Sequence, residues 1–433
     1  MTISTSVDPA GLEAVTVPVD EIPDLIAFAG SDGWLFSDDT GGIAGRGEAL
    51  RINLPHGLCD PADVEAATEK LRSIKSSGDL GRPGCGPLAL GALPFDPAEA
   101  GYLVVPAVVF GRDGDASWIT TVKPVASADP AADPPADQSA AVGELSAAGS
   151  DSPPVLGGSS PERFTLTPTL SHAEWQGIVS AALDEIDCGS FEKVVLARRI
   201  DIEADRDFVV TEVLERLRTL YPSCMLFKME GFIGASPELL VRRHGLEVDS
   251  HPLAGTVARS GDGCDDERLV ASMMGSAKTR REHRVVVDAI AGALRPLCET
   301  LDVPGTPSVM SMRNVSHLAS HIRGRLTADA PSVLGLAAAI HPTPAVGGYP
   351  TEPALRFLQK VEGFDRGRYA GPVGWIDSRG DGCFALGIRS AKVAGRQASI
   401  FAGNGIVAGS DPAGELTETQ LKLQALLSAL VRP

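Results

Sequence analysis

HPTPAVGG (341–348), YAGPVGW (369–375) and GNG (403–405) are three short motifs that precede a predicted helix near the end of the chain. Glu415 and Glu418 share one face of that helix with Lys422, because residues three and four positions apart lie side by side on a helix. These features predict one side of a small-molecule pocket: spaced loops, a strand with the pattern of a buried strand, and inward-facing carboxylates. The rest of the chain should supply the other side.

The composition limits the classes of partner. The chain has 433 residues, enough for two or three average domains, although large mixed α/β enzymes of this size also fold as one unit. Lysine and arginine number 38 against 56 aspartates and glutamates, so the net charge is −18. An acidic chain is a poor binder of polyanions, and we therefore expect no nucleic acid and no membrane partner.

The cysteines and the N-terminus indicate a compartment. Seven scattered cysteines without a CxxC pair disfavour a disulfide framework and a zinc cluster, and they fit a reducing cytosol. Residues 1–20 lack the basic start and apolar core of a signal peptide, and no run approaches the ~18 apolar residues of a membrane span. We expect a soluble, cytoplasmic protein. A monomer is the expected state, although the sequence itself leaves the oligomeric state open.

Residues 1–125 form a predicted β-rich N-terminal part. Apolar pieces at 24–28 and 101–110, separated by glycine and proline, are typical of strands. Within this part only 62–75 has a convincing helical pattern.

Residues 126–161 consist almost entirely of alanine, aspartate, serine, proline and glycine. Such a composition buries too little apolar surface to offset conformational entropy, so we predict a disordered or flexible insertion. The insertion need not separate two domains, because the entropy of loop closure grows slowly with length. We therefore predict one domain over 1–433, with its main part at 162–433.

The segments after the insertion alternate between helices and strands. Ser171 with Glu174 forms a capping-box pattern at the start of a helix. Asp411 and Pro412 have the residue types of an N-cap and first turn. Helices are predicted at 171–186, 208–220, 331–340 and 352–362, two more within 267–294, and one from 411; strands are predicted at 191–198, 225–229, 231–235, 238–243, 317–325, 369–377, 383–393 and 397–402. Hairpins with interspersed helices and no regular βαβ repeat predict an α+β fold of layered antiparallel sheets flanked by helices.

Three carboxylates are candidate metal ligands. Glu282 lies mid-helix among basic residues, and Glu415 and Glu418 share a helix face. If the three converge, they would suit Mg²⁺, which takes oxygen ligands and keeps open positions for water or substrate. A solvated stripe with an ion pair to Lys422 is the alternative, since carboxylates are mostly exposed.

Lys193 and Glu238 are candidates for proton transfer. Lys193 begins an apolar strand, and an inward-facing lysine is a plausible general base because desolvation lowers its pKa. Glu238 enters another apolar strand, where burial would raise its pKa and make it a general acid. The alternatives are a surface lysine and a strand-edge glutamate paired with Arg242 or Arg243.

Several groups are candidates for binding an anion. Arg389 lies within a predicted apolar strand, and a buried arginine needs an anion such as a carboxylate. The predicted glycine turns at 403–405 and 255–256 could present backbone N–H groups, although ordinary hairpins also explain them. His341 is either a pocket group or a satisfied core histidine.

Taken together, these stretches resemble the chorismate-utilising enzymes, the family of isochorismate, salicylate, anthranilate and aminodeoxychorismate synthases. The resemblance covers roughly residues 191–427. It rests on KVVLAR (193–198), GASPE (234–238), PLAGT (252–256), EH (282–283), Arg389, GNGIV (403–407) and the segment 415–422. Within the family, the motifs at 341–348 and 369–375 look like the isochorismate synthase version. The resemblance implies the chorismate-binding fold, similar to anthranilate synthase component I.

The resemblance also implies a reaction and a site. Mg²⁺ held by Glu282, Glu415 and Glu418 would bind the ring carboxylate of chorismate. Lys193 would deprotonate the water that attacks C2, and Glu238 would protonate the departing C4 hydroxyl. The groups expected to bind the enolpyruvyl carboxylate or line the ring site are Thr256, His341, Thr343, Tyr369, Arg389, Gly403, Asn404, Gly405 and Lys422.

Three positions depart from the family pattern. Thr279 stands where the family usually has aspartate, Asn404 where it has alanine, and Cys383 where isochorismate synthases often carry glutamate. None removes a proposed catalytic group, but Thr279 lies one turn from Glu282 and could alter support for the metal.

The prediction is therefore a magnesium-dependent isochorismate synthase that serves menaquinone or siderophore biosynthesis. One alternative is a salicylate synthase, which shares the water addition and then eliminates pyruvate. The other is a catalytically silent chorismate-binding paralogue, motivated by Thr279.

Overall fold

The computed structural model describes residues 8–78, 80–125 and 160–431. In its large sheet the strands form two series of hydrogen-bonded neighbours, called orders below, and strand β6 belongs to both. The first order is β4 (Lys75–Ser77), β1 (Leu12–Pro18), β7 (Ala116–Pro124), β6 (Gly101–Asp113), β3 (Gly41–Leu54), β2 (Trp34–Ser37), β10 (Met225–Met229), β11 (Phe232–Ser236), β22 (Ser390–Ala394), β23 (Gln397–Val407) and β9 (Lys193–Ala204), with β8 (Phe164–Pro168) and β19 (Gly348–Tyr349) beyond β9. The second order runs from β6 to β5 (Leu88–Ala92), β20 (Pro372–Asp377), β21 (Gly382–Leu386), β12 (Leu239–His244), β13 (Glu247–His251), β18 (Ile322–Leu326) and β15 (Cys298–Asp302).

A separate sheet of three strands contains β14 (Leu253–Ala258), β17 (Val315–Ala319) and β16 (Ser308–Ser311). Among the described strands every pairing is antiparallel except that of β1 with β4. The predicted α+β fold with antiparallel sheets is confirmed in this respect. The N-terminal part pairs with the rest of the chain in both orders, through β2–β10 and β5–β20, and the division of the chain into one domain stays a prediction.

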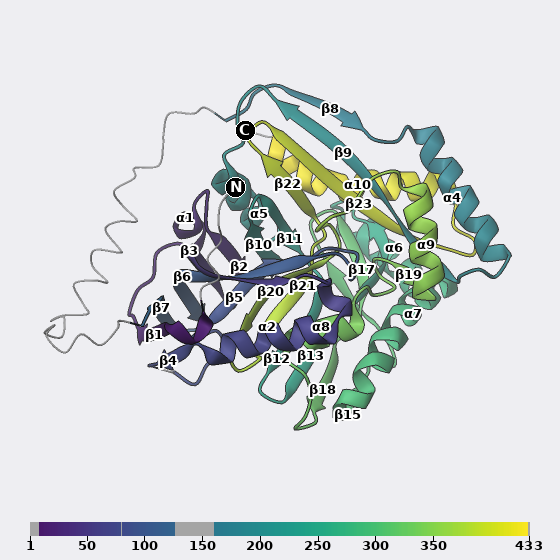
Figure 1. Cartoon of the computed structure of the whole chain (residues 1–433). Coiled ribbons are helices and arrows are strands. Elements are labelled where there is room, and N and C mark those ends of the chain that lie inside the picture. The colour runs from purple at the N-terminus through teal and green to yellow at the C-terminus, as the bar shows by residue number, and fades with distance from the viewer. Residues whose placement is uncertain (1–7, 79, 126–159, 432–433) are drawn as a thin grey trace, which may run out of the picture.

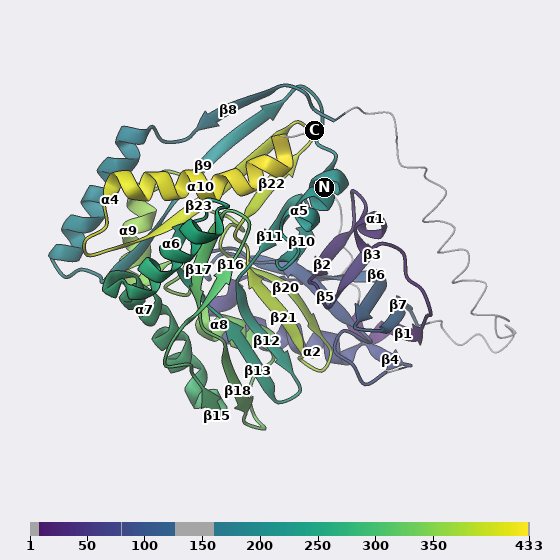
Figure 2. The same ribbon diagram turned by 180° about the vertical axis from the view of Figure 1, so that it is seen from behind.

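Helices cover these sheets, as Figures 1 and 2 show. They are α1 (Leu25–Ala29), α2 (Pro61–Ser73), α4 (His172–Asp187), α5 (Val210–Leu220), α6 (Gly263–Gly275), α7 (Ala277–Leu294), α8 (Val333–Ile340), α9 (Thr351–Val361) and α10 (Pro412–Val431). The C-terminal helix α10 packs on β23 and beside α4. Within the described residues, no helix combines the length and the low polarity that a membrane crossing requires.

The predicted helix caps are present. Ser171 and Glu174 form a reciprocal capping box at the start of α4. Asp411 accepts a hydrogen bond from Gly414 N–H at 2.8 Å and so caps α10. The predicted pair of helices within 267–294 is also present as α6 and α7, which meet at Ser276.

One N-terminal prediction is wrong, because residues 24–28 contain the N-cap and first four residues of helix α1 and not a strand. The carboxylate of Asp24 accepts hydrogen bonds from Ile26 and Ala27 N–H at 2.9 and 3.1 Å. This side-chain cap stabilises a first helical turn in a segment too short for periodicity to reveal.

Two predicted single strands are each divided in two. The segment 317–325 contains the end of β17 and the start of β18, which belong to different sheets. The segment 383–393 contains parts of β21 and β22, separated by 387–389, where Arg389 has a positive φ of 50°. Gly387 allows this crossing between the two orders, because a Cβ there would lie 2.9 Å from the backbone oxygen of Arg368.

The GNG motif is not a turn. Gly403, Asn404 and Gly405 lie inside β23 and pair in register with Ala197, Leu196 and Val195 of β9. The prediction of a turn at 403–405 is therefore wrong, whereas the substrate-binding role of these residues stays a prediction. Gly255 lies at a register irregularity in β14, with a φ of +77°. The predicted insertion at 126–161 falls almost entirely outside the described residues.

Candidate active site

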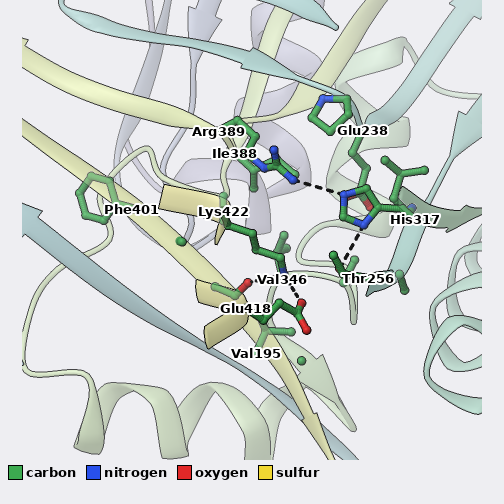
Figure 3. Close-up of a pocket in the computed structure, with 18 of the residues that line it drawn as sticks. Val195, Glu238, Thr256, His317, Val346, Ile388, Arg389, Phe401, Glu418 and Lys422 are labelled. Carbon is green, nitrogen blue, oxygen red and sulfur yellow. Dashed lines mark hydrogen bonds and ion pairs between the residues drawn. The ribbon is translucent and has the colours of Figure 1, made fainter. Parts of the chain in front are cut away.

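One cavity contains most of the predicted site residues, which come from β9, β14, β23, α7, α10, the loops before β12 and β20, and the segment between β21 and β22. Ten line it: Lys193, Glu238, Thr256, Glu282, Tyr369, Arg389, Gly403, Gly405, Glu418 and Lys422. Four predicted residues are not among those that line it: His341, Thr343, Asn404 and Glu415. Figure 3 shows Glu238, Arg389 and Lys422 extending toward the same space from different elements.

Lys193 is the first residue of β9 and is only 1% exposed. Its Nζ lies 3.3 Å from Oε1 of Glu282, which comes from α7. Gly405 on the neighbouring strand makes room for both groups, since a Cβ there would lie 2.4 Å from Glu282 Oε1 and 2.8 Å from Lys193 Cε. The glycine therefore serves close packing around an ion pair.

Glu238 lies between β11 and β12 and is 4% exposed. Leu253 N–H donates to its Oε1 at 3.3 Å. Burial raises the pKa of Glu238 to about 7, and the hydrogen bond and the charges of Lys193 and Lys422 oppose that rise. A carboxyl group with this pKa is partly protonated near neutrality and can donate a proton.

Arg389 is held by His317, which the sequence predicts only as part of a strand. Arg389 Nη2 donates to Nε2 of His317 at 3.2 Å. The Nδ1–H of His317 therefore faces Thr256 Oγ1 at 3.1 Å and the Gly255 carbonyl at 3.3 Å. Burial and the charge of Arg389 hold the pKa of His317 well below its usual value, so the ring is neutral.

The other amino group of Arg389 is a buried donor without an acceptor. Within the described residues, Nη1 makes no hydrogen bond although it is buried. Burial also lowers the pKa of this guanidinium. Because an unpaired buried donor on a cation is costly, an anion in the cavity is the partner that the arrangement lacks.

Tyr369 lies in the turn before β20 and stacks on Phe401, with ring centroids 4.8 Å apart. A Cβ on Gly403 would lie 3.0 Å from the Tyr369 hydroxyl, so this hydroxyl reaches β23 over the glycine. Burial raises the pKa of Tyr369 to about 12, and the phenol is therefore a neutral donor.

Helix α10 contributes one cation and two carboxylates. Lys422 Nζ donates to Gly403 O at 2.8 Å and Asn404 Oδ1 at 3.0 Å, and it pairs with Glu418 Oε1 at 2.8 Å. Glu415 pairs with Lys278 at 3.6 Å. Burial raises the pKa of Glu415, and the nearby charges of Glu418 and Glu282 add to the rise.

The three candidate metal ligands are thus close enough to repel one another, and each has a lysine partner. Their ligand atoms do not all lie within 4.8 Å of one another; in the described chain, the group of three that meets that spacing is His56, Asp60 and Asp63, at the start of α2. A donor set of three partly buried carboxylates with unfavourable mutual charge fits a hard divalent cation, which would relieve that repulsion.

His341 and Thr343 correct the prediction for the HPTP loop. His341 Nε2 contacts the Phe95 carbonyl at 2.9 Å in the core, and burial lowers the pKa of the ring to about 4. Thr343 Oγ1 accepts from Ala345 N–H at 3.3 Å within its own turn. Only the following residues of the loop, Ala345 and Val346, face the cavity. The sequence shows polar residues in a loop but not which of its two sides faces the cavity.

The departures from the family pattern also have definite contacts. Thr279 N–H donates to the capping Ser276 Oγ at 3.2 Å, and its methyl group packs over Gly255. Cys383 is buried in β21. Asn404 is buried between β23 and α10.

A family model for chorismate binding enzymes matches residues 32–431. The chain therefore belongs to the chorismate-binding enzymes. It is similar to the salicylate biosynthesis isochorismate synthase of Pseudomonas aeruginosa, with 45% identity over 261 residues that cover 59% of this chain and 54% of that protein. It is also similar to isochorismate synthase DhbC of Bacillus subtilis, with 35% identity over 402 residues that cover 88% of this chain and 91% of that protein.

A solved structure agrees over nearly the whole length. The menaquinone-specific isochorismate synthase MenF from Escherichia coli superposes with a TM-score of 0.79 at 25% identity, covering 98% of this chain and 95% of that one. The predicted chorismate-binding fold is confirmed by this match together with the family model.

Proposed function

We propose that the chain is an isochorismate synthase, an isomerase that converts chorismate to isochorismate for menaquinone or siderophore biosynthesis. The observation that carries the proposal is the placing of Lys193, Glu238 and the unpaired Arg389 donor around one cavity. The names of the relatives, which are isochorismate synthases, agree with it.

The cavity has the donors that a dianion needs. Arg389 Nη1 and the Tyr369 hydroxyl would hold the enolpyruvyl carboxylate, and Lys422 would add a positive charge at the same wall. Thr256, fixed by His317, would contact the ring. Charge-assisted hydrogen bonds of this kind fix orientation as well as affinity.

Lys193 and Glu238 would exchange the hydroxyl positions on the ring. Acting as the general base, Lys193 would take a proton from the water whose oxygen bonds to C2. The ring double bonds shift, the C4–O bond breaks, and Glu238 donates the proton with which the C4 hydroxyl leaves as water. One water enters and one leaves, so substrate and product are isomers. Return of the proton from Lys193 to Glu238 through solvent completes the cycle.

Mg²⁺ is the proposed cofactor, with Glu282, Glu415 and Glu418 as the residues that would hold it. A bound magnesium ion supplies Lewis-acid polarisation of the ring carboxylate. The two positive charges of Mg²⁺ would balance the two negative charges of the substrate, so the pair would leave the net charge of the site unchanged. We further propose that the enzyme acts in the cytoplasm, which its seven free cysteines favour.

Product analysis tests the proposal. Purified protein is incubated with chorismate and Mg²⁺, and the products are followed by NMR. Isochorismate as the only product supports the proposal, whereas salicylate with pyruvate would replace it with a salicylate synthase. No turnover by the wild type would favour the silent paralogue.

A second measurement assigns the proton-transfer roles. Lys193→Ala and Glu238→Gln should each lower turnover by roughly 10²–10⁴-fold, the range for loss of a general acid or base. Circular dichroism must show that both variants are folded. Unchanged turnover in a folded Lys193→Ala variant would contradict the mechanism.

A further inference from the structure

We infer that Asn404 is a positioning residue that orients two groups of α10 at once, Glu415 and Lys422. The inference rests on the proposed function, because it concerns the proposed metal ligand and the proposed substrate-binding lysine. Asn404 lies in β23, is fully buried, and is not among the residues that line the cavity.

The amide of Asn404 bonds in two directions. Its Nδ2 donates to the backbone carbonyl of Glu415 at 2.8 Å and to Glu415 Oε2 at 3.1 Å. Its Oδ1 accepts from Lys422 Nζ at 3.0 Å. One side chain therefore links the first turn of α10 to a residue two turns further along.

Only an amide satisfies all of these partners. Glu415 presents two acceptors and Lys422 presents a donor, whereas an asparagine side chain carries both an NH₂ group and a carbonyl. Aspartate would place a carboxylate against that of Glu415, and alanine would remove both the side-chain donor to Glu415 and the side-chain acceptor for Lys422.

Asn404 helps to fix the orientation of the Glu415 carboxylate. Oε2 accepts from Asn404, Oε1 faces Lys278 at 3.6 Å, and Ser410 also hydrogen-bonds this carboxylate, so Asn404 is one of three groups that orient it. Groups that orient metal ligands change metal affinity by roughly 10- to 100-fold when they are removed. Asn404 also holds Lys422 beside Gly403, where the ammonium faces the cavity.

Magnesium binding by the substrate-free protein tests the inference. Isothermal titration calorimetry with Mg²⁺ should give a Kd for Asn404→Ala about tenfold or more above that of the wild type. The KM for chorismate should also rise, because Lys422 loses the Asn404 carbonyl as an acceptor and keeps only Gly403 O and Glu418 as partners.

Asn314→Ala is the matched control. Asn314 Nδ2 donates to the Leu421 carbonyl at 2.9 Å, so it also anchors α10, but this hydrogen bond involves neither Glu415 nor Lys422. A general loosening of α10 would affect both variants, whereas positioning predicts a raised Mg²⁺ Kd for Asn404→Ala only. Thermal unfolding of both variants checks that the fold is intact.

The outcomes are distinguishable. Equal Mg²⁺ affinities of wild type and Asn404→Ala, or equal losses in Asn404→Ala and Asn314→Ala, would overturn the inference and leave the proposed function standing. Absence of saturable Mg²⁺ binding by the wild type would overturn the metal site together with the inference, and isochorismate formation would then have to be examined separately.

Discussion

At the scale of single residues, the site depends on groups whose burial changes their chemistry. The sequence predicts Lys193 and Glu238 because charged residues interrupt apolar strands, but it does not show that both are almost fully enclosed. His317 escaped prediction because a histidine in an apolar strand has the same local pattern whether it is a core residue or a support for a distant arginine. The contact between His317 and Arg389 joins residues 72 positions apart.

Glu238 should make stability depend on pH. Its pKa is about 7 in the folded protein against 4.5 in the unfolded chain, so the neutral form is favoured by folding. The contribution of this group to the free energy of unfolding is fully present below pH 4.5 and is lost as the pH rises from there through about 7. The loss is about 3 kcal/mol.

Glu238→Gln should remove this loss. Urea unfolding at pH 5 and pH 8 should show the variant gaining stability relative to the wild type at the higher pH. A difference between the two proteins that does not change with pH would contradict the raised pKa. In the wild type, kcat/KM should fall as pH rises above about 7, because the acid becomes ionised.

Arg389→Lys should weaken substrate binding. Lysine keeps the charge but lacks the planar fork, so it cannot donate to His317 and to a carboxylate in the same geometry. The KM for chorismate should rise by about 10- to 100-fold, the loss of one charged hydrogen bond. Steady-state kinetics measures the change, and an unaltered KM would show that this guanidinium does not hold the substrate.

At the scale of elements, β23 and α10 form one unit of the site. Periodicity and capping residues predict α10 correctly, since these signals are local. The GNG motif is misread as a turn because glycine marks both turns and places of close packing. Only the positions of β9, α7 and the turn before β20 show that the glycines of β23 accommodate Lys193, Glu282 and Tyr369.

Gly405→Ala should therefore damage the site more than the fold. The added methyl group would lie 2.4 Å from Glu282 Oε1 and 2.8 Å from Lys193 Cε, and these side chains must move away. Turnover should fall by about 10²-fold or more, because displacement of a reacting group by about 1 Å has effects of that size. The thermal midpoint should change by only a few degrees.

A suitable control is Gly292→Ala in α7. No atom lies within 4 Å of the added Cβ outside its own helix, and alanine is favoured over glycine in a helix. This variant should retain wild-type turnover. Full activity in Gly405→Ala would contradict the close packing around Lys193.

At the scale of the whole molecule, both orders of strands and the small sheet contribute to one cavity. Its walls come from segments between residues 193 and 422, so no local stretch predicts it alone. The sequence predicts most elements and the general class of fold, because periodicity, caps and hairpins are local. The sequence does not predict that one apolar segment contains strands of two sheets, as at 317–325. It also does not predict which residues of a loop face the core and which face the cavity, as at His341.

Turnover of chorismate in ¹⁸O-labelled water with Mg²⁺ tests the central claim most directly. Attack of water on C2 and loss of the C4 hydroxyl predict isochorismate that carries one ¹⁸O atom, at C2, as mass spectrometry and NMR would show. Unlabelled isochorismate would mean that the hydroxyl migrates within the substrate, which contradicts the roles of Lys193 and Glu238. Salicylate and pyruvate in its place would contradict the proposed function itself.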